Sequence, residues 1–227
     1  MSQERAVLFG GTGLVGGYVL QTLLNDSSFE KVVVVTRRSI SLAHPKLKVV
    51  KIDFSNLKEY EDCIKNSSIV FSSIGTTASK VRGDQDKYRQ IDLDITHNIG
   101  NICKKLDIKK FLFISSIGAN INSPNFYLKL KGDIENSLQD LHLNSLVILQ
   151  PSLLLGHRTE FRLGERVAQI LIPILSFFLP SNIKPVNAKL VARTMVFYSK
   201  SNKRGNQIIS NSKIIGLKNK IGYSIQL

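Results

Sequence analysis

Residues 6–20 read AVLFGGTGLVGGYVL, and this stretch decides the fold. The apolar run from Ala6 to Phe9 is typical of a short buried strand, and the glycines that follow lead into an amphipathic sequence typical of a helix. The spacing satisfies both G-x-x-G-x-x-G, counted from Gly10, and G-x-G-x-x-G, counted from Gly11. Such a pattern between a strand and a helix is typical of a turn that binds a dinucleotide.

The turn has the chemistry that a pyrophosphate requires. Glycine allows positive φ angles and lets bare backbone approach a phosphate, and the helix that begins near Leu14 directs its unpaired N–H groups and positive dipole end toward the anion. A glycine-rich turn without any ligand is the alternative interpretation. The residues predicted to contact a cofactor here are Gly10, Thr12, Gly13, Leu14, Val15 and Gly16.

The next apolar run predicts which dinucleotide is bound. Lys31 to Thr36 (KVVVVT) reads as a buried parallel strand, and Arg37 and Arg38 follow it directly. At this position an acid holds the ribose 2′-hydroxyl of NAD, whereas arginine accommodates the 2′-phosphate of NADP. We therefore expect NADP(H), with both arginines as a phosphate clamp; two solvated surface arginines are the alternative.

Strands and helices alternate along the rest of the chain. Since strands that alternate with helices form parallel sheets, we expect an α/β fold with a doubly wound, mainly parallel sheet and helices on both faces. The expected further strands are residues 46–52, 68–73, 110–115, 145–149 and a possible edge strand at 207–210. The expected helices are residues 56–65, about 87–106, a stretch from Ser123 that contains Tyr127, the apolar stretch 161–179, and 187–199, with a basic tail at the end.

Several strand ends carry further candidate contacts to the cofactor. Asp53 and Phe54 follow the third strand, where they are suited to face the adenine. The segment Ile74, Gly75, Thr76 and Thr77 follows the fourth strand, and its glycine allows the backbone to approach a ligand. Pro151 and Ser152 follow the sixth strand and are expected on the nicotinamide side.

A candidate reaction centre follows the fifth strand. Ser115 and Ser116 stand at the strand end, and Tyr127 and Lys131 lie four residues apart on a helix expected to start at Ser123 and Pro124. An ammonium beside a phenol favours the phenolate, which suits proton exchange with an alcohol or a carbonyl, and a serine hydroxyl is suited to hold the substrate oxygen. An exposed tyrosine and a solvated lysine on an amphipathic helix are the alternative interpretation.

Charge is divided unevenly along the chain. Residues 151–227 carry 12 basic and two acidic side chains, so this part favours an anionic partner such as a phosphorylated cofactor or substrate, or a membrane surface. A solvated basic surface explains the same pattern. Because no nucleic-acid-binding motif accompanies the charge, we expect no specific nucleic acid as partner.

Other sequence features favour a cytoplasmic protein. There is no secretory signal, and the longest apolar run, residues 170–179, is too short to span a bilayer. A helix that lies at the surface of a membrane is the alternative interpretation of this run. Cys63 and Cys103 are expected as buried, reduced side chains, and the scattered histidines predict no metal site.

With these motifs in order, the chain resembles the short-chain dehydrogenase/reductase superfamily, most closely the atypical branch that includes the Tat-interacting protein. The resemblance is carried by FGGTGLVGGYVL, TRRS, SSIGTT, RQIDLDIT, FISSIGA, NFYLKLKGDIE, PSLLLGHRTEFRLGE and KPVNAKLVARTMV. It implies a Rossmann domain spanning residues 1–227, in which residues from about 151 form a small substrate lobe. One departure is Gln150, where many members carry arginine before the proline.

The resemblance also implies NADP(H) binding and a catalytic serine, tyrosine and lysine. By position these are Ser116, Tyr127 and Lys131, with Ser115 in support and with Lys131 also on the nicotinamide ribose. We expect an NADP(H)-dependent oxidoreductase that acts on a small carbonyl or alcohol, as a monomer or homodimer. Two other hypotheses stay open: a binding or regulatory protein that uses NADPH as a ligand, and a nucleotide-sugar epimerase or dehydratase.

Overall fold

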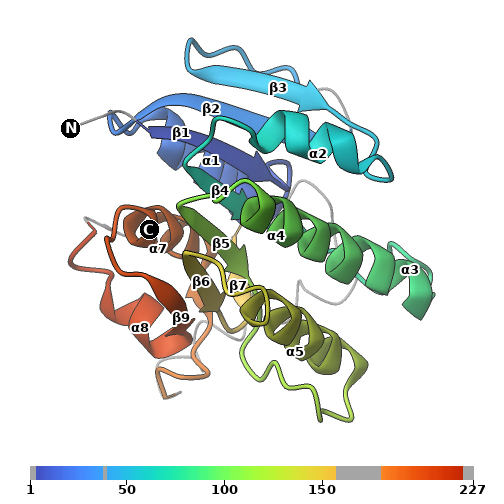
Figure 1. Ribbon diagram of the computed structural model, residues 1–227. Coiled ribbons are helices and arrows are strands. Elements are labelled where there is room, and N and C mark those ends of the chain that lie inside the picture. The colour runs from blue at the N-terminus through green and yellow to red at the C-terminus, as the bar shows by residue number, and fades with distance from the viewer. Residues whose placement is uncertain (1–3, 38–39, 157–179, 222–227) are drawn as a thin grey trace.

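The computed structural model describes residues 4–37, 40–156 and 180–221. Seven strands form one sheet in the order β3-β2-β1-β4-β5-β6-β9, and every neighbouring pair runs parallel (Figure 1). These strands are β1 (Glu4–Phe9), β2 (Phe29–Thr36), β3 (Leu47–Lys51), β4 (Ile69–Ser72), β5 (Lys110–Ile114), β6 (Ser145–Gln150) and β9 (Gly205–Ser210). Two short parallel strands, β7 (Leu154–Leu155) and β8 (Val186–Asn187), pair separately.

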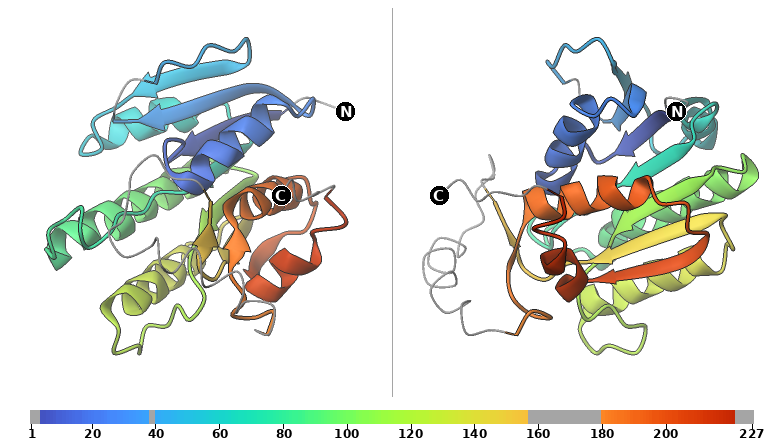
Figure 2. Two further views of the ribbon diagram at one scale, coloured as in Figure 1. Left: turned by 180° about the vertical axis from the view of Figure 1, so that it is seen from behind. Right: turned by 90° about the vertical axis from the view of Figure 1, so that its left-hand side faces the viewer.

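Helices cover both faces of the sheet. One face packs against α1 and α7, and the other packs against α2, α4 and α5, as the edge-on view in Figure 2 shows. The helical elements are α1 (Leu14–Leu24), α2 (Leu57–Ile64), α3 (Gln85–Arg89), the π-helical turn η1 (Gln90–Asp94), α4 (Ile95–Lys105), α5 (Phe126–Gln139), α7 (Ala188–Ser199) and α8 (Asn211–Gly216). The doubly wound α/β fold expected from the sequence is confirmed.

The strand order places a crevice beside the glycine-rich turn. β1 pairs with β2 on one side and with β4 on the other, so the chain reverses its direction of winding at β1. Ligands of open α/β sheets bind outside the carboxyl ends of the strands at such a switch point. The central strands are apolar on both sides because helices cover both faces; Val32 to Val35 in β2, for example, are all buried.

The structure corrects two expectations about helices. The helix that carries Tyr127 is not capped by Ser123: Asn125 is its N-cap, and the Asn125 side chain accepts a hydrogen bond from the Leu128 N–H at 3.1 Å. Asparagine competes well with serine for this position, so the cap lies two residues later. Part of the expected basic tail is also ordered, since residues 211–216 form α8 behind the capping hydroxyl of Ser210. The helix expected at 161–179 lies outside the described residues.

The helix expected at about 87–106 exists, but it is not uniform. It begins at Gln85 as α3, widens into η1 and continues as α4. Tyr88, Asp92 and Thr96, spaced four residues apart along this helix, are all buried.

The packing around Gly132 on α5 leads to a test. A Cβ atom at Gly132 would lie 2.4 Å from backbone atoms of Asn120 and Ile121, which cannot move without displacing the loop before α5. Gly132→Ala should therefore destabilise the protein by about 1–3 kcal/mol. Gly216→Ala on α8 is the control, since a Cβ there meets nothing within 4 Å, and it should change stability by at most about 1 kcal/mol. Urea unfolding measures both; equal midpoints for the two variants would contradict this packing.

Candidate cofactor and reaction site

The glycine-rich turn requires glycine at two positions, Gly10 and Gly16. Gly10 has a φ of +80°, and a Cβ there would lie 2.7 Å from the carbonyl carbon of Ser73. A Cβ at Gly16 would lie 2.1 Å from the Gly10 carbonyl oxygen. Any side chain at either position would force the end of β1, the start of α1 and the end of β4 apart.

The start of α1 is a suitable anion site. Gly13 is the N-cap and has no side chain to satisfy the N–H groups of the first turn, so these groups are available to a phosphate. Thr12 and Gly13 are exposed, Leu14 is half-buried, and Val15 and Gly16 are buried. These residues therefore fit a bound pyrophosphate through backbone N–H groups.

The carboxyl end of β2 carries positive charge beside this turn. Arg37 is exposed and follows Thr36, whose neighbour Val35 pairs with Phe9 at the end of β1. Register also places Lys51, at the end of β3, opposite Thr36. Lys51 carries no signal in the sequence, because only the pairing of β2 with β3 brings it close to Arg37. The predicted partner Arg38 lies outside the described residues.

Asp53 and Phe54 have different surroundings. The Phe54 ring packs edge-on against Phe9 and Tyr60, with ring centroids 6.3 and 5.6 Å away, so it forms part of the wall behind the β1 end. Asp53 is exposed, and its carboxylate accepts a hydrogen bond from the Ser55 N–H at 2.9 Å, which lowers the pKa of the Asp53 carboxyl. The structure thus leaves Asp53 ionised and open to solvent beyond β3.

The loop after β4 is held at its centre. Asp92 accepts a hydrogen bond from the Thr76 N–H at 2.7 Å, and the Tyr88 hydroxyl donates to the Thr76 carbonyl oxygen at 3.1 Å. Gly75 lies beside Asp92 and Lys131: a Cβ there would be 3.6 Å from an Asp92 carboxylate oxygen and 4.0 Å from the Lys131 Nζ. Both polar groups of the Thr76 backbone are therefore fixed by side chains of α3 and η1.

Tyr127 and Lys131 lie together on α5, as the sequence predicts. The Lys131 Nζ lies 5.8 Å from the centroid of the Tyr127 ring and 5.4 Å from that of Phe113. Lys131 is only 4% exposed and donates a hydrogen bond to Asp92 at 2.9 Å. Burial acts to lower the pKa of Lys131, but the charge of Asp92, followed by that of Tyr127, outweighs it and holds this pKa above its usual value.

The two serines at the end of β5 differ in environment. The Ser116 hydroxyl is half-buried and donates a long hydrogen bond of 3.3 Å to the Ile117 carbonyl oxygen. Ser115 is buried and faces Glu135 on α5. Both Glu135 carboxylate oxygens accept from the Gln150 amide nitrogen, at 3.0 and 2.9 Å. Burial raises the pKa of Glu135 despite these contacts.

A hollow of about 510 Å³ opens in front of Tyr127, which is 37% exposed. It is large enough for a small organic substrate. Its lining comes from the loop after β4, from α3 and from the start of α5: Thr76, Thr77, Ala78, Gly83, Gln85, Tyr88, Asn125, Phe126 and Tyr127. The Thr76 loop and Tyr127 therefore face one space.

Pro151 and Ser152 follow β6, but the polar groups of Ser152 serve the fold. The Ser152 N–H donates to the Asn211 side chain at 3.0 Å, and its hydroxyl donates to the Lys184 carbonyl oxygen at 2.5 Å. The Pro151 carbonyl oxygen accepts from the Ile117 N–H at 2.9 Å, which ties this turn to the β5 end. A direct role of Ser152 in cofactor binding stays a prediction.

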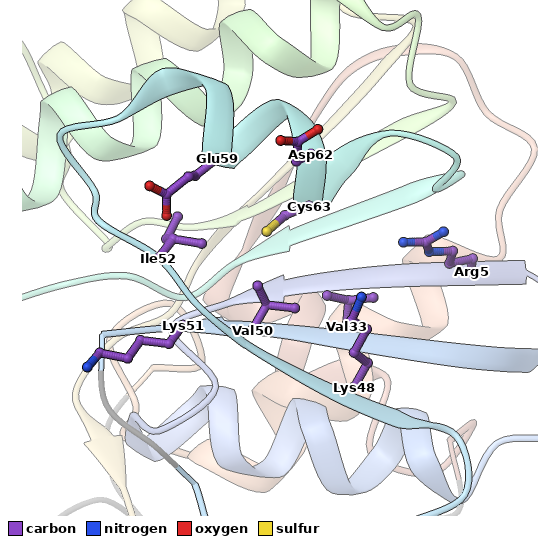
Figure 3. Close-up of a pocket in the computed structure, with 9 residues that line it drawn as sticks. All are labelled: Arg5, Val33, Lys48, Val50, Lys51, Ile52, Glu59, Asp62 and Cys63. Carbon is purple, nitrogen blue, oxygen red and sulfur yellow. The ribbon is translucent and has the colours of Figure 1, made fainter.

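A smaller hollow of about 190 Å³ lies between β3 and α2 (Figure 3). Its acidic side chains already have partners: Glu59 accepts from the Asp53 N–H at 3.0 Å, and Asp62 pairs with Lys65 at 2.6 Å. Lys51 lines this hollow, but none of the residues that the sequence predicts for the cofactor or the reaction does. We therefore place the reaction site in front of Tyr127 and not here.

Comparison with known proteins identifies the family. The sequence pattern of the NAD(P)H-binding family matches residues 10–166. The chain belongs to this family. Protein FMP52, mitochondrial, of Candida albicans is 28% identical over 87% of this chain and 89% of its own length, and protein HTATIP2 of Rattus norvegicus is 28% identical over 74% and 70%. The resemblance to the atypical short-chain dehydrogenase branch is confirmed.

Solved structures show the same fold. A UDP-N-acetylglucosamine 4-epimerase from Methanobrevibacter ruminantium, in complex with UDP-N-acetylmuramic acid, has a TM-score of 0.72 at 20% identity, covering 98% of this chain and 83% of that one. At this identity the likeness shows the Rossmann fold alone.

The expectation of a cytoplasmic location is wrong. The similar FMP52 proteins of several yeasts are named mitochondrial. The expectation was based on the lack of a secretory signal and of a spanning apolar run, and these features do not separate one non-secretory compartment from another. Among the described residues, no helix has the length and apolar character needed to cross a bilayer.

Two neighbouring glycines of α1 give a matched test of the cofactor turn. Gly16→Ala places a methyl group against the Gly10 carbonyl oxygen, so we expect the variant to lose NAD(P)H binding by at least about tenfold in Kd. Gly17→Ala should retain binding, because its Cβ would meet the nearest atom, the Gly11 carbonyl oxygen, at 3.9 Å. Fluorescence titration with NADPH measures both variants; equal affinities would contradict the proposed cofactor turn.

Proposed function

We propose that this protein is an NADP(H)-dependent oxidoreductase that moves a hydride between nicotinamide and a small carbonyl or alcohol. The observation that carries the proposal is the placement of Tyr127 at the wall of the 510 Å³ hollow with the Lys131 ammonium 5.8 Å from its ring. The loop after β4 lines the same hollow, and β4 pairs with β1, whose end leads into the glycine-rich turn.

The side chains divide the reaction between them. When bound, the cofactor supplies the hydride that adds to the carbonyl carbon. The Tyr127 hydroxyl gives its proton to the carbonyl oxygen during reduction and takes the proton back from the alcohol during oxidation. The Lys131 ammonium stabilises the resulting phenolate, and the Ser116 hydroxyl, by turning from Ile117, is suited to hold the substrate oxygen.

The cofactor preference is proposed from charge. Arg37 and Lys51 stand at the adjacent ends of β2 and β3, beside the turn that receives the pyrophosphate. An arginine at the end of β2 accommodates a 2′-phosphate, which NADP carries and NAD lacks. In accordance with the names of the FMP52 relatives, we propose that the reaction takes place at mitochondria.

An epimerase or dehydratase would use the same tyrosine and lysine, and a regulatory protein would bind NADPH without turnover. An epimerase restores its cofactor within each cycle, so it consumes no free NADPH. Net oxidation of NADPH with a carbonyl substrate therefore favours the oxidoreductase, and binding without turnover across a carbonyl panel favours the regulatory alternative.

Tyr127→Phe tests the proton transfer. Removing the hydroxyl should lower kcat for carbonyl reduction by about 10²–10⁴-fold, because the substrate oxygen loses its proton donor. NADPH affinity should stay within about threefold, since the ring is retained. Steady-state NADPH oxidation over a carbonyl panel measures the effect. Undiminished kcat in the variant would contradict the assigned role of Tyr127.

Arg37→Ala tests the cofactor preference. Loss of the guanidinium should weaken NADPH binding by about 10-fold or more, corresponding to a charge-assisted contact of at least about 1.4 kcal/mol. NADH binding should change little and serves as the internal control, because NADH carries no 2′-phosphate. Titration with both nucleotides measures the ratio; a parallel loss for both would assign Arg37 a structural role instead.

A further inference from the structure

Asp92 is a buried acid that links two parts of the site. Its side chain is 1% exposed, one carboxylate oxygen accepts from the Thr76 N–H at 2.7 Å, and the other accepts from the Lys131 Nζ at 2.9 Å. Thr76 lines the hollow in front of Tyr127, and Lys131 lies behind the Tyr127 ring. A single carboxylate thus fixes the loop after β4 and the lysine of α5.

Asp92 is a buried residue within a π-helical segment of the backbone. Asp92 lies in the middle of η1, and π turns are rare and occur frequently at functional sites. Burying a carboxylate costs free energy unless its oxygens accept hydrogen bonds, and each Asp92 oxygen accepts one here. Asp94, two residues later in the same turn, is exposed.

We propose that Asp92 is a positioning residue for the reaction centre. Its carboxylate keeps Lys131 charged and close to Tyr127, and it also holds the Thr76 loop in place beside these two residues. The proposal rests on the oxidoreductase function proposed above. Without the Asp92 charge, burial favours the neutral form of Lys131. Tyr127 then loses the cation that favours its phenolate form.

The other groups around Lys131 do not replace Asp92. Three titratable side chains face its Nζ: Asp92 from η1, and Tyr127 and Glu135 from α5. Both Glu135 oxygens accept from the Gln150 amide, whereas the Lys131 Nζ donates directly to Asp92 at 2.9 Å. Asp92 is accordingly the strongest of the influences that raise the pKa of Lys131, and Glu135 is the weakest.

Asp92→Asn separates charge from shape. The asparagine oxygen still accepts from the Thr76 N–H, but the side chain no longer carries the charge that balances Lys131. In alcohol oxidation with NADP⁺, where Tyr127 takes the proton, the rising limb of the pH–rate profile should move about one unit or more to higher pH, which lowers the rate at pH 7 about tenfold. Asp94→Asn is the matched control and should leave the profile unchanged. A limb that stays in place or moves to lower pH would overturn the proposal.

Thermal unfolding tests the charge pairing without turnover. In the wild type the pKa of Lys131 is higher in the folded protein than in the unfolded chain. The charged Lys131 therefore contributes stability that is fully present below the pKa of the unfolded state and is lost as the pH rises through the pKa of the folded state. In Asp92→Asn, burial lowers this pKa instead, so the Tm deficit relative to wild type should be largest near pH 7 and shrink toward pH 10. A deficit independent of pH would overturn the pairing. The wild type could reduce no carbonyl while the Tm deficit of Asp92→Asn still depends on pH. That result would refute the proposed oxidoreductase function but support the pairing of Asp92 with Lys131.

Discussion

The structure depends on the absence of side chains where β1, α1 and β4 meet. Gly10 and Gly16 lie so close to the end of β4 and to each other that a single methyl group would overlap backbone atoms. The Ser73 hydroxyl closes the same junction by hydrogen bonding to the Phe9 and Gly10 carbonyl oxygens, each at 3.1 Å. The close approach brings the start of α1 to the switch point of the sheet, where its free N–H groups are suited to a phosphate. Cofactor binding is thus a property of the backbone at this point.

The same junction continues into the reaction centre. Three residues after Ser73, the backbone of Thr76 is held by Tyr88 and Asp92, and Asp92 also holds Lys131. The path from the glycine-rich turn to α5, which carries Tyr127, therefore consists of consecutive residues of one loop and the buried ion pair of Asp92 and Lys131. Such a pair adds little stability in itself because both charges are desolvated, but it fixes the position of the groups that it joins. Asp92 lies within the π turn of η1.

Most of the fold was predictable because its signals are local. Apolar runs such as Val32 to Val35, together with the glycine spacing, identify the strands, their parallel arrangement and the turn that binds a dinucleotide. The pair Tyr127 and Lys131 was predictable because four residues on a helix place two side chains on one face. Asp92 and Lys51 were not, since their roles depend on contacts between elements distant in sequence: η1 with α5, and β3 with β2. A π turn has no sequence signal of its own, so the inward rotation of Asp92 becomes visible only in three dimensions.

The departure at Gln150 fits the charge balance of this buried site. Lys131 is one cation between two acids, Asp92 and Glu135. An arginine at the end of β6 would pair with Glu135 and stabilise its ionised form. Gln150 instead donates its amide to both Glu135 oxygens without adding a charge, and burial raises the pKa of that carboxyl. The Lys131 ammonium donates its hydrogen bond to Asp92 at 2.9 Å. Gln150 thus satisfies both Glu135 oxygens without placing a second cation beside Lys131.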